Sequence, residues 1–177
     1  MSALEVVRLG HPALRRKSER VGVSELAGAA FQKFLDELAA TCLEGNGVGI
    51  AAPQVGINKR VIVIHVDPSN PRYPGRPAFP LTFIINPRII SRSPEQIEDW
   101  EGDMSANIRA LVPRAASCVV TGLDRQGRPM RYDLAHDFHA RVFQHEIDHL
   151  NGKFFTDRMR RKDTLTELAE WERYWKK

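Results

Sequence analysis

The chain has 177 residues, of which 42% are hydrophobic and 27% are charged, and its formal net charge is +4. This length suits one domain with a substantial core, and no stretch approaches the 18 uninterrupted apolar residues expected of a membrane span. Two cysteines, Cys42 and Cys118, are too few for a disulfide framework. We therefore expect one domain over residues 1–177 in a reducing compartment such as the cytoplasm, with neither a membrane segment nor a secretory signal.

The first predicted elements are a helix and two strands. Ser24 is a suitable N-cap for a helix that runs to about Leu43. Segments 60–66 and 82–90 are rich in β-branched residues, which favours strands. Between them, segment 67–80 holds five prolines and one glycine in 14 residues, so it is predicted to be a functional or mobile loop.

The later part of the chain is predicted to contain a hairpin followed by two helices. Segment 117–134 is typical of a hairpin. A helix is expected from near Leu134 to Gly152, where glycine suits a left-handed cap. A last helix is expected to start at the capping-box pattern of residues 164–167. This order indicates an α+β fold, with small antiparallel or mixed sheets around a central helix and with helices at both ends of the chain.

The predicted central helix contains the sequence QHEIDHLNG, residues 144–152, which is a His-Glu-x-x-His motif. Because residues four apart share one face of a helix, His145 and His149 could hold one divalent metal ion. Glu146 would then act as a general base. From the histidine and glutamate content of the chain, only about 0.01 such matches are expected by chance. The motif therefore predicts a metal-dependent hydrolase.

A catalytic site of this kind needs a third protein ligand. Residues that could supply it are Asp103, Cys118, Asp148, Glu167 and Glu170. Asp148 is adjacent to His149 and faces another side of the helix. Spacing alone does not choose among the others.

Three separated segments resemble the peptide deformylase family. GVGIAAPQVG (47–56) matches the family's Gly-x-Gly-x-Ala-Ala-x-Gln segment, and QHEIDHLNG matches its metal-binding helix. WEGDMS (100–105) matches the family's Glu-Gly-Cys-Leu-Ser segment imperfectly. The resemblance spans nearly the whole chain. It implies an enzyme that removes the N-formyl group from the N-terminal methionine of newly synthesised proteins.

The resemblance also implies the ligands of the metal ion. These are His145, His149 and the residue at the family's cysteine position, which is Asp103 here. Two histidines and one carboxylate are typical of non-haem Fe(II) sites. The implied cofactor is Fe²⁺, with Zn²⁺, Ni²⁺ or Co²⁺ as alternatives.

Catalytic and substrate-binding roles follow from the same resemblance. Glu146 would be the general base, and the side-chain amide of Gln54 and the backbone N–H of Met104 would stabilise the oxyanion. The backbone of Gly47 and Gly49 would pair with an extended peptide. The remaining residues expected around the substrate, most of them in a methionine pocket, are Val48, Ile50, Glu101, Arg109, Phe138, Arg141 and Val142. The stretch SANIRALVPR lacks the family's proline and is one residue shorter, so this part of the groove is expected to differ.

Several alternatives stay open from the sequence. A divergent paralogue could hydrolyse another N-acyl amide weakly, and a non-catalytic module could bind peptide termini. A zinc endopeptidase that uses Glu167 or Glu170 leaves the two upstream segments unexplained. The basic C-terminal region, densest in DRMRRK (157–162), favours a transient ribosome contact. No basic motif interleaved with aromatic residues is present, so specific DNA binding is not expected.

Overall fold

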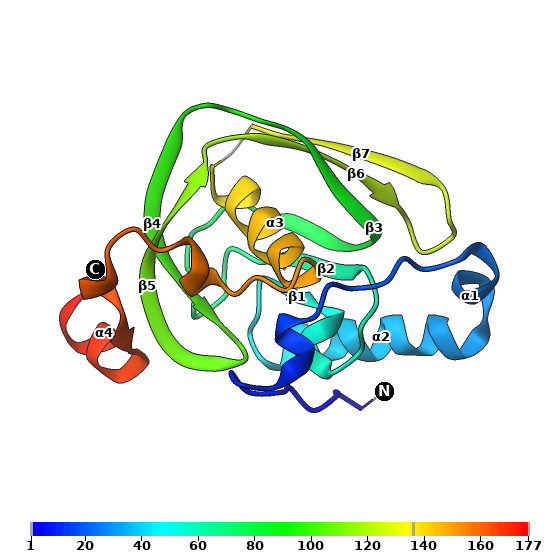
Figure 1. Cartoon of the computed structure of the whole chain (residues 1–177), viewed down its shortest axis with the longest axis horizontal. Helices are drawn as coiled ribbons and strands as arrows, with labels where there is room; N and C mark the ends of the chain where they lie inside the picture. The colour runs from blue at the N-terminus through cyan, green and yellow to red at the C-terminus, as the bar shows by residue number, and fades with distance from the viewer. Residues whose placement is uncertain (1, 136, 177) are drawn as a thin grey trace.

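The computed structural model describes residues 2–135 and 137–176 and has the predicted α+β fold (Figure 1). Two antiparallel sheets surround a central helix, α3 (Asp137–Leu150). The five-stranded sheet consists, in spatial order, of β1 (Gly49–Ala51), β2 (Val61–Val66), β3 (Phe79–Arg92), β6 (Cys118–Leu123) and β7 (Pro129–Leu134). The three-stranded sheet consists of β4 (Gln96–Asp103), β5 (Ala106–Ala115) and β8 (Thr166–Glu167). The other α-helices are α1 (Val23–Ala27), α2 (Ala29–Glu44) and α4 (Leu168–Tyr174). None of the helices in the described ranges is long and apolar enough to cross a bilayer.

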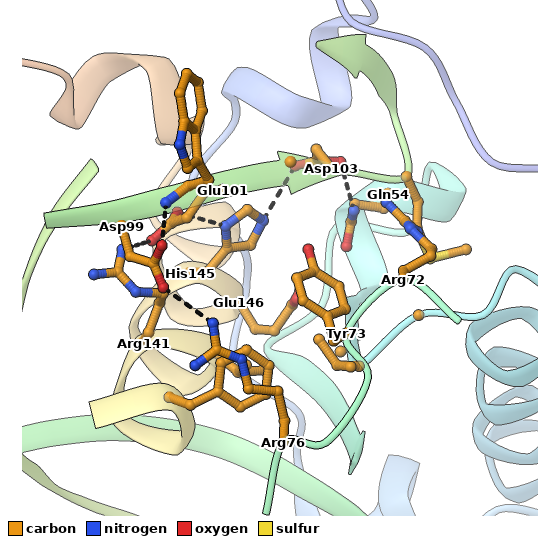
Figure 2. A pocket seen from close by; sticks show the side chains of 18 residues that line it. Gln54, Arg72, Tyr73, Arg76, Asp99, Glu101, Asp103, Arg141, His145 and Glu146 are labelled. Carbon is orange, nitrogen blue, oxygen red and sulfur yellow. Dashed lines mark hydrogen bonds and ion pairs between the residues drawn. The ribbon is translucent and has the colours of Figure 1, made fainter. Parts of the chain in front are cut away.

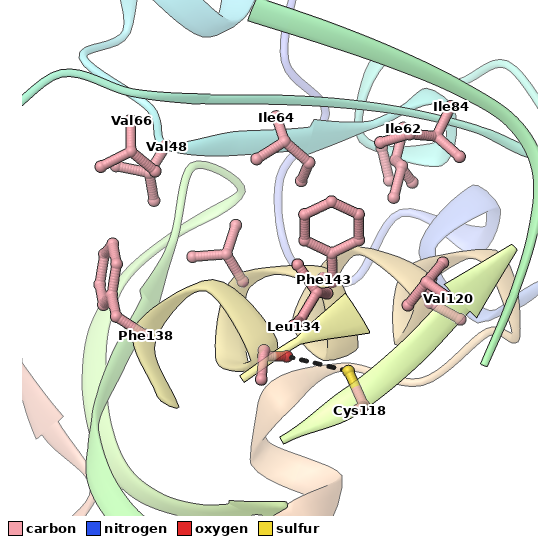
Figure 3. Close-up of a cluster of buried hydrophobic side chains, with 14 of the residues drawn as sticks. Val48, Ile62, Ile64, Val66, Ile84, Cys118, Val120, Leu134, Phe138 and Phe143 are labelled. Carbon is pink, nitrogen blue, oxygen red and sulfur yellow. Dashed lines mark hydrogen bonds between the residues drawn. The ribbon is translucent and has the colours of Figure 1, made fainter. Parts of the chain in front are cut away.

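Strand β2 separates the two largest parts of the core. Ile62 and Ile64, on one face, pack in the same cluster as Phe143 of α3 (Figure 3). Val61 and Val63, on the other face, pack in a cluster with side chains of α2. Because successive side chains of a strand point to opposite faces, a strand that is covered on both faces is apolar almost throughout. This explains the nearly continuous apolar run of β2.

The two cysteines are free and buried, and each packs as a small side chain in the core. Burial raises the pKa of Cys42 to about 12 and that of Cys118 to about 11. Both thiols are therefore protonated near neutral pH, and neither belongs to a disulfide.

Helix α3 is buried on all sides, although many of its side chains are polar. Twelve of its 14 residues are buried. Buried polar groups need partners, so Gln144 accepts from the backbone N–H of Ala115 at 3.2 Å and donates to its carbonyl at 3.0 Å. Beyond the helix, Gly152 has a φ of +68°, which confirms the predicted left-handed cap. The helix begins later than predicted, because Leu134 ends β7.

The predicted N-terminal helix consists of two helices. α1 and α2 are separated by Gly28, whose backbone is extended (φ −71°, ψ 136°). Glycine has a low helix propensity, which makes this position a natural break. The predicted cap at Ser24 is wrong, because Ser24 lies inside α1. The N-cap is Gly22, which forms no side-chain hydrogen bond.

The predicted capping box at residues 164–167 is also wrong. Thr164 Oγ1 accepts from the backbone N–H of Leu111 at 3.2 Å and donates to the carbonyl of Arg161 at 2.7 Å. The last two residues of that segment pair with β5 as strand β8, and α4 begins at Leu168. Pairing with a distant strand overrides the local capping pattern.

The β4–β5 hairpin is an element that the sequence did not predict. Its register pairs Asp103 with Ala106 and leaves Met104 and Ser105 as the turn. The hairpin predicted for residues 117–134 is confirmed as β6 and β7. Strand β3 begins at Phe79 and extends beyond both ends of the predicted strand, which shortens the proline-rich loop before it.

Candidate active site

Three buried side chains converge where α3 faces the end of β4. Oδ2 of Asp103 lies 3.2 Å from Nε2 of His145 and 2.9 Å from Nε2 of His149. One potential ligand atom from each residue lies within 4.8 Å of the other two. The structure therefore places the two histidines of the motif beside the aspartate at the family's cysteine position.

The other candidate ligands have different surroundings. Asp148 forms ion pairs with Arg114 and Arg158. Cys118 is buried between β6 and α3, with Sγ 4.0 Å from the carbonyl oxygen of Ala140. Glu167 and Glu170 are exposed, on β8 and α4. Among the residues that the structure describes, the group able to hold a metal ion is Asp103, His145 and His149.

His149 shows that the three residues fit a divalent ion. Its side chain is fully buried, and neither of its ring nitrogens has a hydrogen-bond partner. Nε2 is close to the Asp103 carboxylate, but that contact lacks hydrogen-bond geometry. A buried polar atom without a partner is costly. Two imidazole nitrogens and one carboxylate oxygen form a donor set suited to Fe²⁺ and similar ions, which would satisfy that atom.

The second oxygen of Asp103 fixes the orientation of its carboxylate. Oδ1 accepts hydrogen bonds from the side-chain amide of Gln54 at 2.9 Å and from the backbone N–H of Ser105 at 2.7 Å. Oδ2 therefore points toward the two imidazole rings (Figure 2). Burial opposes ionisation of Asp103, but attraction to His149 and hydrogen bonding with His145 hold its pKa well below the usual value. The carboxylate is therefore ionised and oriented, as a metal ligand must be.

Glu146 lines the same pocket from α3. Its side chain is buried, and Oε2 has no hydrogen-bond partner. Burial raises the pKa of Glu146 to about 7, although His145 and His149 oppose the shift. Gly49 packs directly against this carboxylate, since a Cβ at that position would lie 2.6 Å from Oε1. The pocket thus contains a carboxylate that can exchange a proton near neutral pH.

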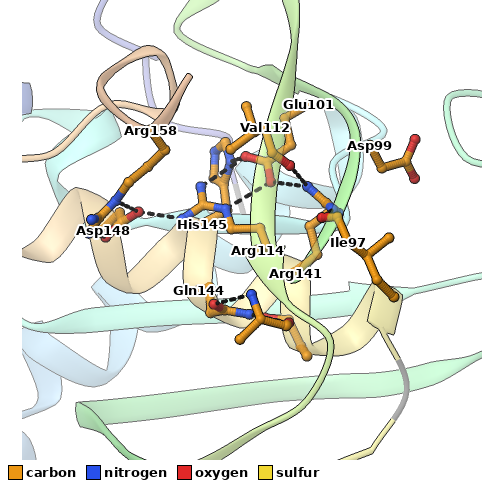
Figure 4. A network of polar contacts seen from close by, with 12 residues as sticks. Ile97, Asp99, Glu101, Val112, Arg114, Arg141, Gln144, His145, Asp148 and Arg158 are labelled. Carbon is orange, nitrogen blue, oxygen red and sulfur yellow. Dashed lines mark hydrogen bonds and ion pairs between the residues drawn. The ribbon is translucent and has the colours of Figure 1, made fainter. Parts of the chain in front are cut away.

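Glu101 sets the orientation of His145 (Figure 4). Its Oε2 accepts a hydrogen bond from Nδ1 of His145 at 2.9 Å, which directs Nε2 of that ring toward Asp103. Arg114 donates to both oxygens of Glu101 at 2.9 Å, and Arg141 donates to Oε1 at 2.7 Å. Burial would raise the pKa of Glu101, but Arg114 and His145 keep it far below the ordinary value. Glu101, which was predicted to lie around the substrate, is therefore a positioning residue for His145.

Loss of the Arg114 charge is expected to destabilise the fold. Arg114 is 5% exposed and bridges Glu101 and Asp148. Arg114→Met leaves two buried carboxylates without this partner, and we expect the free energy of unfolding to fall by about 3–5 kcal/mol. Arg131→Met is the matched control, because Arg131 pairs with Asp133 at the surface, where solvent screening leaves such pairs with little effect on stability. Denaturant unfolding measures both changes, and equal losses would contradict this account.

A pocket beside the three convergent residues contains most of the predicted substrate-binding residues. Its lining includes Gly47, Val48, Gly49, Gln54, Glu101, Asp103, Met104, Phe138, Arg141, Val142, His145 and Glu146. Two of the predicted substrate-binding residues, Ile50 and Arg109, do not line the pocket. Ile50 is fully buried and packs in the α2 core cluster. Arg109 is buried behind the loop residue Tyr73, to whose hydroxyl it donates at 2.9 Å.

The guanidinium of Arg141 is occupied by structural contacts. Besides Glu101, it donates to the backbone carbonyls of Val112 at 2.7 Å and Ile97 at 2.6 Å. Only the aliphatic stem of this side chain is therefore available to the pocket.

Six lining residues were not predicted from the sequence: Arg72, Tyr73, Arg76, Asp99, Trp100 and Gly102. Tyr73 and Arg76 belong to the proline-rich loop and face α3 across the pocket (Figure 2). Tyr73 packs on Phe138 with ring centroids 5.6 Å apart, and Arg76 lies 4.7 Å from the centroid of the same ring. The available signal was the length of the loop, because loops of this length are usually functional.

Comparison with known proteins identifies the family. The family model described as polypeptide deformylase matches residues 3–164. Peptide deformylase 2 of Nostoc sp. is 43% identical over 166 residues, which cover 93% of this chain and 90% of the relative. A peptide deformylase of Leptospira biflexa is 34% identical, with 90% and 89% covered. Crystal structures of class I type b peptide deformylase from Acinetobacter baumannii superpose with a TM-score of 0.86 for one complex and 0.85 for a Met-Ala-Ser complex. Both are 40% identical; they cover 90% of this chain and 99% and 100% of the matched chains. The chain therefore belongs to the polypeptide deformylase family.

Proposed function

We propose that this enzyme removes the N-formyl group from the N-terminal methionine of newly synthesised proteins. The observation that carries the proposal is the convergence of Asp103, His145 and His149 beside the pocket that Glu146 lines. The comparisons favour a deformylase over a different N-acyl amidase or a pure binding module. The bound Met-Ala-Ser of the Acinetobacter protein is consistent with a site for an N-terminal methionine.

Asp103, His145 and His149 would hold a divalent ion, for which we propose Fe²⁺, with Zn²⁺, Ni²⁺ and Co²⁺ as the other ions to test. When bound, such an ion supplies Lewis-acid polarisation and lowers the pKa of a coordinated water. Glu146 would accept a proton and pass it to the departing amine. A pKa of about 7 suits both transfers near neutral pH.

Gln54 would stabilise the developing oxyanion. Its Oε1 accepts from the backbone N–H of Ala51 at 2.8 Å, and Nε2 donates one hydrogen to Asp103. An amide nitrogen carries two hydrogens, so the second can serve the formyl oxygen while the first holds the ligand. The backbone N–H of Met104, beside Asp103 in the turn, would be the other donor.

The peptide backbone would extend the five-stranded sheet. Strand β1 is at the edge of that sheet, because it pairs only with β2 among the described strands. The backbone of Gly47 and Gly49 at this edge would pair with the substrate as an added strand. Val48, Phe138 and Val142 supply the apolar wall that a methionine side chain requires.

The activity is tested by formate release from formyl-Met-Ala-Ser, with protein purified anaerobically and its metal content measured. We expect a bound transition metal and formate release, with acetyl-Met-Ala-Ser as the control substrate. Bound metal without formate release would favour a paralogue with another N-acyl substrate. Protein that binds no metal under any reconstitution would favour the non-catalytic module.

Gly49→Ala is expected to lower kcat by about 10–100-fold, because the new methyl group would displace the Glu146 carboxylate. Gly22→Ala is the control, since no atom lies within 4 Å of a Cβ at Gly22. Formate release and metal content are measured for both variants. A fully active Gly49→Ala enzyme would show that the position of the Glu146 carboxylate is not critical.

We also propose a cytoplasmic location and a transient ribosome contact through the basic C-terminal region. Within that region, Arg158 pairs with Asp148 and Arg161 pairs with Asp163. A ribosome contact would therefore depend mainly on Arg160 and its neighbours. Cosedimentation of wild-type protein and of Arg160→Ala with ribosomes at several salt concentrations tests this contact.

A further inference from the structure

The C-terminal segment, residues 165–176, forms a wall beside the active-site pocket. It follows the part matched by the family model, which ends at residue 164. Strand β8 pairs with β5, with Thr166 opposite Arg109, and α4 lies beside this sheet (Figure 1). Trp171 and Trp175 contact Trp100 of β4, with ring centroids 6.2 Å and 5.8 Å apart. These contacts hold the segment next to the hairpin that carries Asp103.

A groove lies between this segment and the proline-rich loop. Its volume is about 620 Å³, and it shares five lining residues with the active-site pocket: Arg72, Tyr73, Arg76, Asp99 and Trp100. The groove therefore adjoins the pocket. Only a formyl group precedes the methionine in the proposed substrate. A peptide segment that reaches the groove from the pocket must therefore come from the residues that follow methionine.

Arg109 is a buried cation of this groove without an acidic partner. It is 3% exposed, and no carboxylate of the described residues lies within 4.0 Å of its guanidinium. Its guanidinium carbon lies 4.9 Å from the ring centroid of Trp171 and 5.5 Å from that of Tyr73. By contrast, the buried residues Arg114 and Arg141 both bind Glu101. A buried charge without a counter-ion is costly, so the environment of Arg109 favours an anion supplied by a ligand.

The rest of the groove also presents donors and positive charge. Nε1 of Trp171 is buried without a hydrogen-bond partner. Arg72 and Lys176 add two cations to the lining, and its one carboxylate, Asp99, is paired with Arg76 at 3.2 Å. The groove thus contains four cations, one carboxylate and an unused N–H donor. Its chemistry matches a carboxylate, which accepts several hydrogen bonds and carries a negative charge.

We propose that this groove is a specificity subsite for an acidic side chain in the substrate peptide, downstream of the formyl-methionine. The inference rests on the proposed deformylase function and adds a sequence preference to it. Arg109 and Trp171 would bind the carboxylate, and Arg72 and Lys176 would contribute to the positive potential around it.

The test compares formyl-Met peptides that carry Glu or Gln as the second, third or fourth residue. At one of these positions we expect kcat/KM to be about tenfold higher for the Glu peptide than for the Gln peptide. This difference should shrink as salt is added. Arg109→Met should bring the ratio of kcat/KM for the Glu peptide to kcat/KM for the Gln peptide close to one. Trp171→Phe, which keeps an aromatic ring and removes the N–H, should lower this ratio by about threefold. Arg131→Met, on β7 outside the groove, should keep the full preference.

Equal kcat/KM values for Glu and Gln at all three positions, with formate still released, would overturn the subsite and leave the deformylase function intact. A preference that survives in both Arg109→Met and Trp171→Phe would also overturn it. Absence of formate release from every peptide would overturn the proposed function instead. Tryptophan fluorescence titration with Met-Ala-Glu and Met-Ala-Gln then decides the subsite by binding, and equal affinities would reject it. Fluorescence quenching by a short RNA that acidic peptides do not displace would assign the groove to nucleic acid and reject the proposal.

Discussion

Replacement of Glu146 with glutamine is expected to lower kcat for formate release by about 10²–10⁴-fold, while the metal content stays near that of the wild type. Glutamine is close to glutamate in size but cannot accept and return a proton. Glu146 lies outside the convergent group of Asp103, His145 and His149, so its loss leaves all three proposed ligands in place. Glu146→Ala is expected to abolish turnover in the same way.

Glu170→Gln is the matched control for this prediction. Glu170 is exposed on α4, and it would be a ligand only in a zinc endopeptidase. We expect this variant to keep full activity and full metal content. If Glu146→Gln loses its metal, Glu146 is a ligand and not the base. If Glu170→Gln loses its metal, the assignment of Asp103 is wrong.

The second large effect is expected at Asp103. Asp103→Ala removes one of the three proposed ligands and leaves Gln54 and Ser105 without their shared acceptor. Loss of a group that only orients a ligand typically costs 10–100-fold in metal affinity, so loss of the ligand itself should cost more than about 100-fold. Metal content after dialysis against a chelator measures the change, and formate release should fall in parallel.

Two further substitutions complete the Asp103 experiment. Asp103→Cys introduces the residue that the family resemblance predicts at this position, and it should retain metal and raise activity if the aspartate weakens the site. Asp99→Asn is the control, because Asp99 lies on the same strand and lines the same pocket but pairs with Arg76. We expect normal metal content in Asp99→Asn. Full metal retention in Asp103→Ala would exclude this carboxylate as a ligand.

Local sequence patterns were sufficient for the metal-binding helix and for parts of the sheets. The four-residue spacing of His145 and His149 depends only on helix geometry, and the apolar run of β2 depends only on burial of both faces. The β6–β7 hairpin and the cap at Gly152 also follow from short-range turn chemistry. The family resemblance pointed to Asp103, which spacing alone did not separate from Cys118, Glu167 and Glu170.

Tertiary structure decided the features that depend on residues far apart in the chain. Asp103 is about 40 positions before the two histidines, and only packing of the β4–β5 hairpin against α3 brings their atoms together. Arg109 is buried because the proline-rich loop and the C-terminal segment both cover it. The strand pairing of β8 likewise overrode a local helix-capping signal. Backbone periodicity and turn chemistry act over a few residues and can be read from the sequence, whereas these contacts depend on which distant surfaces bury each other.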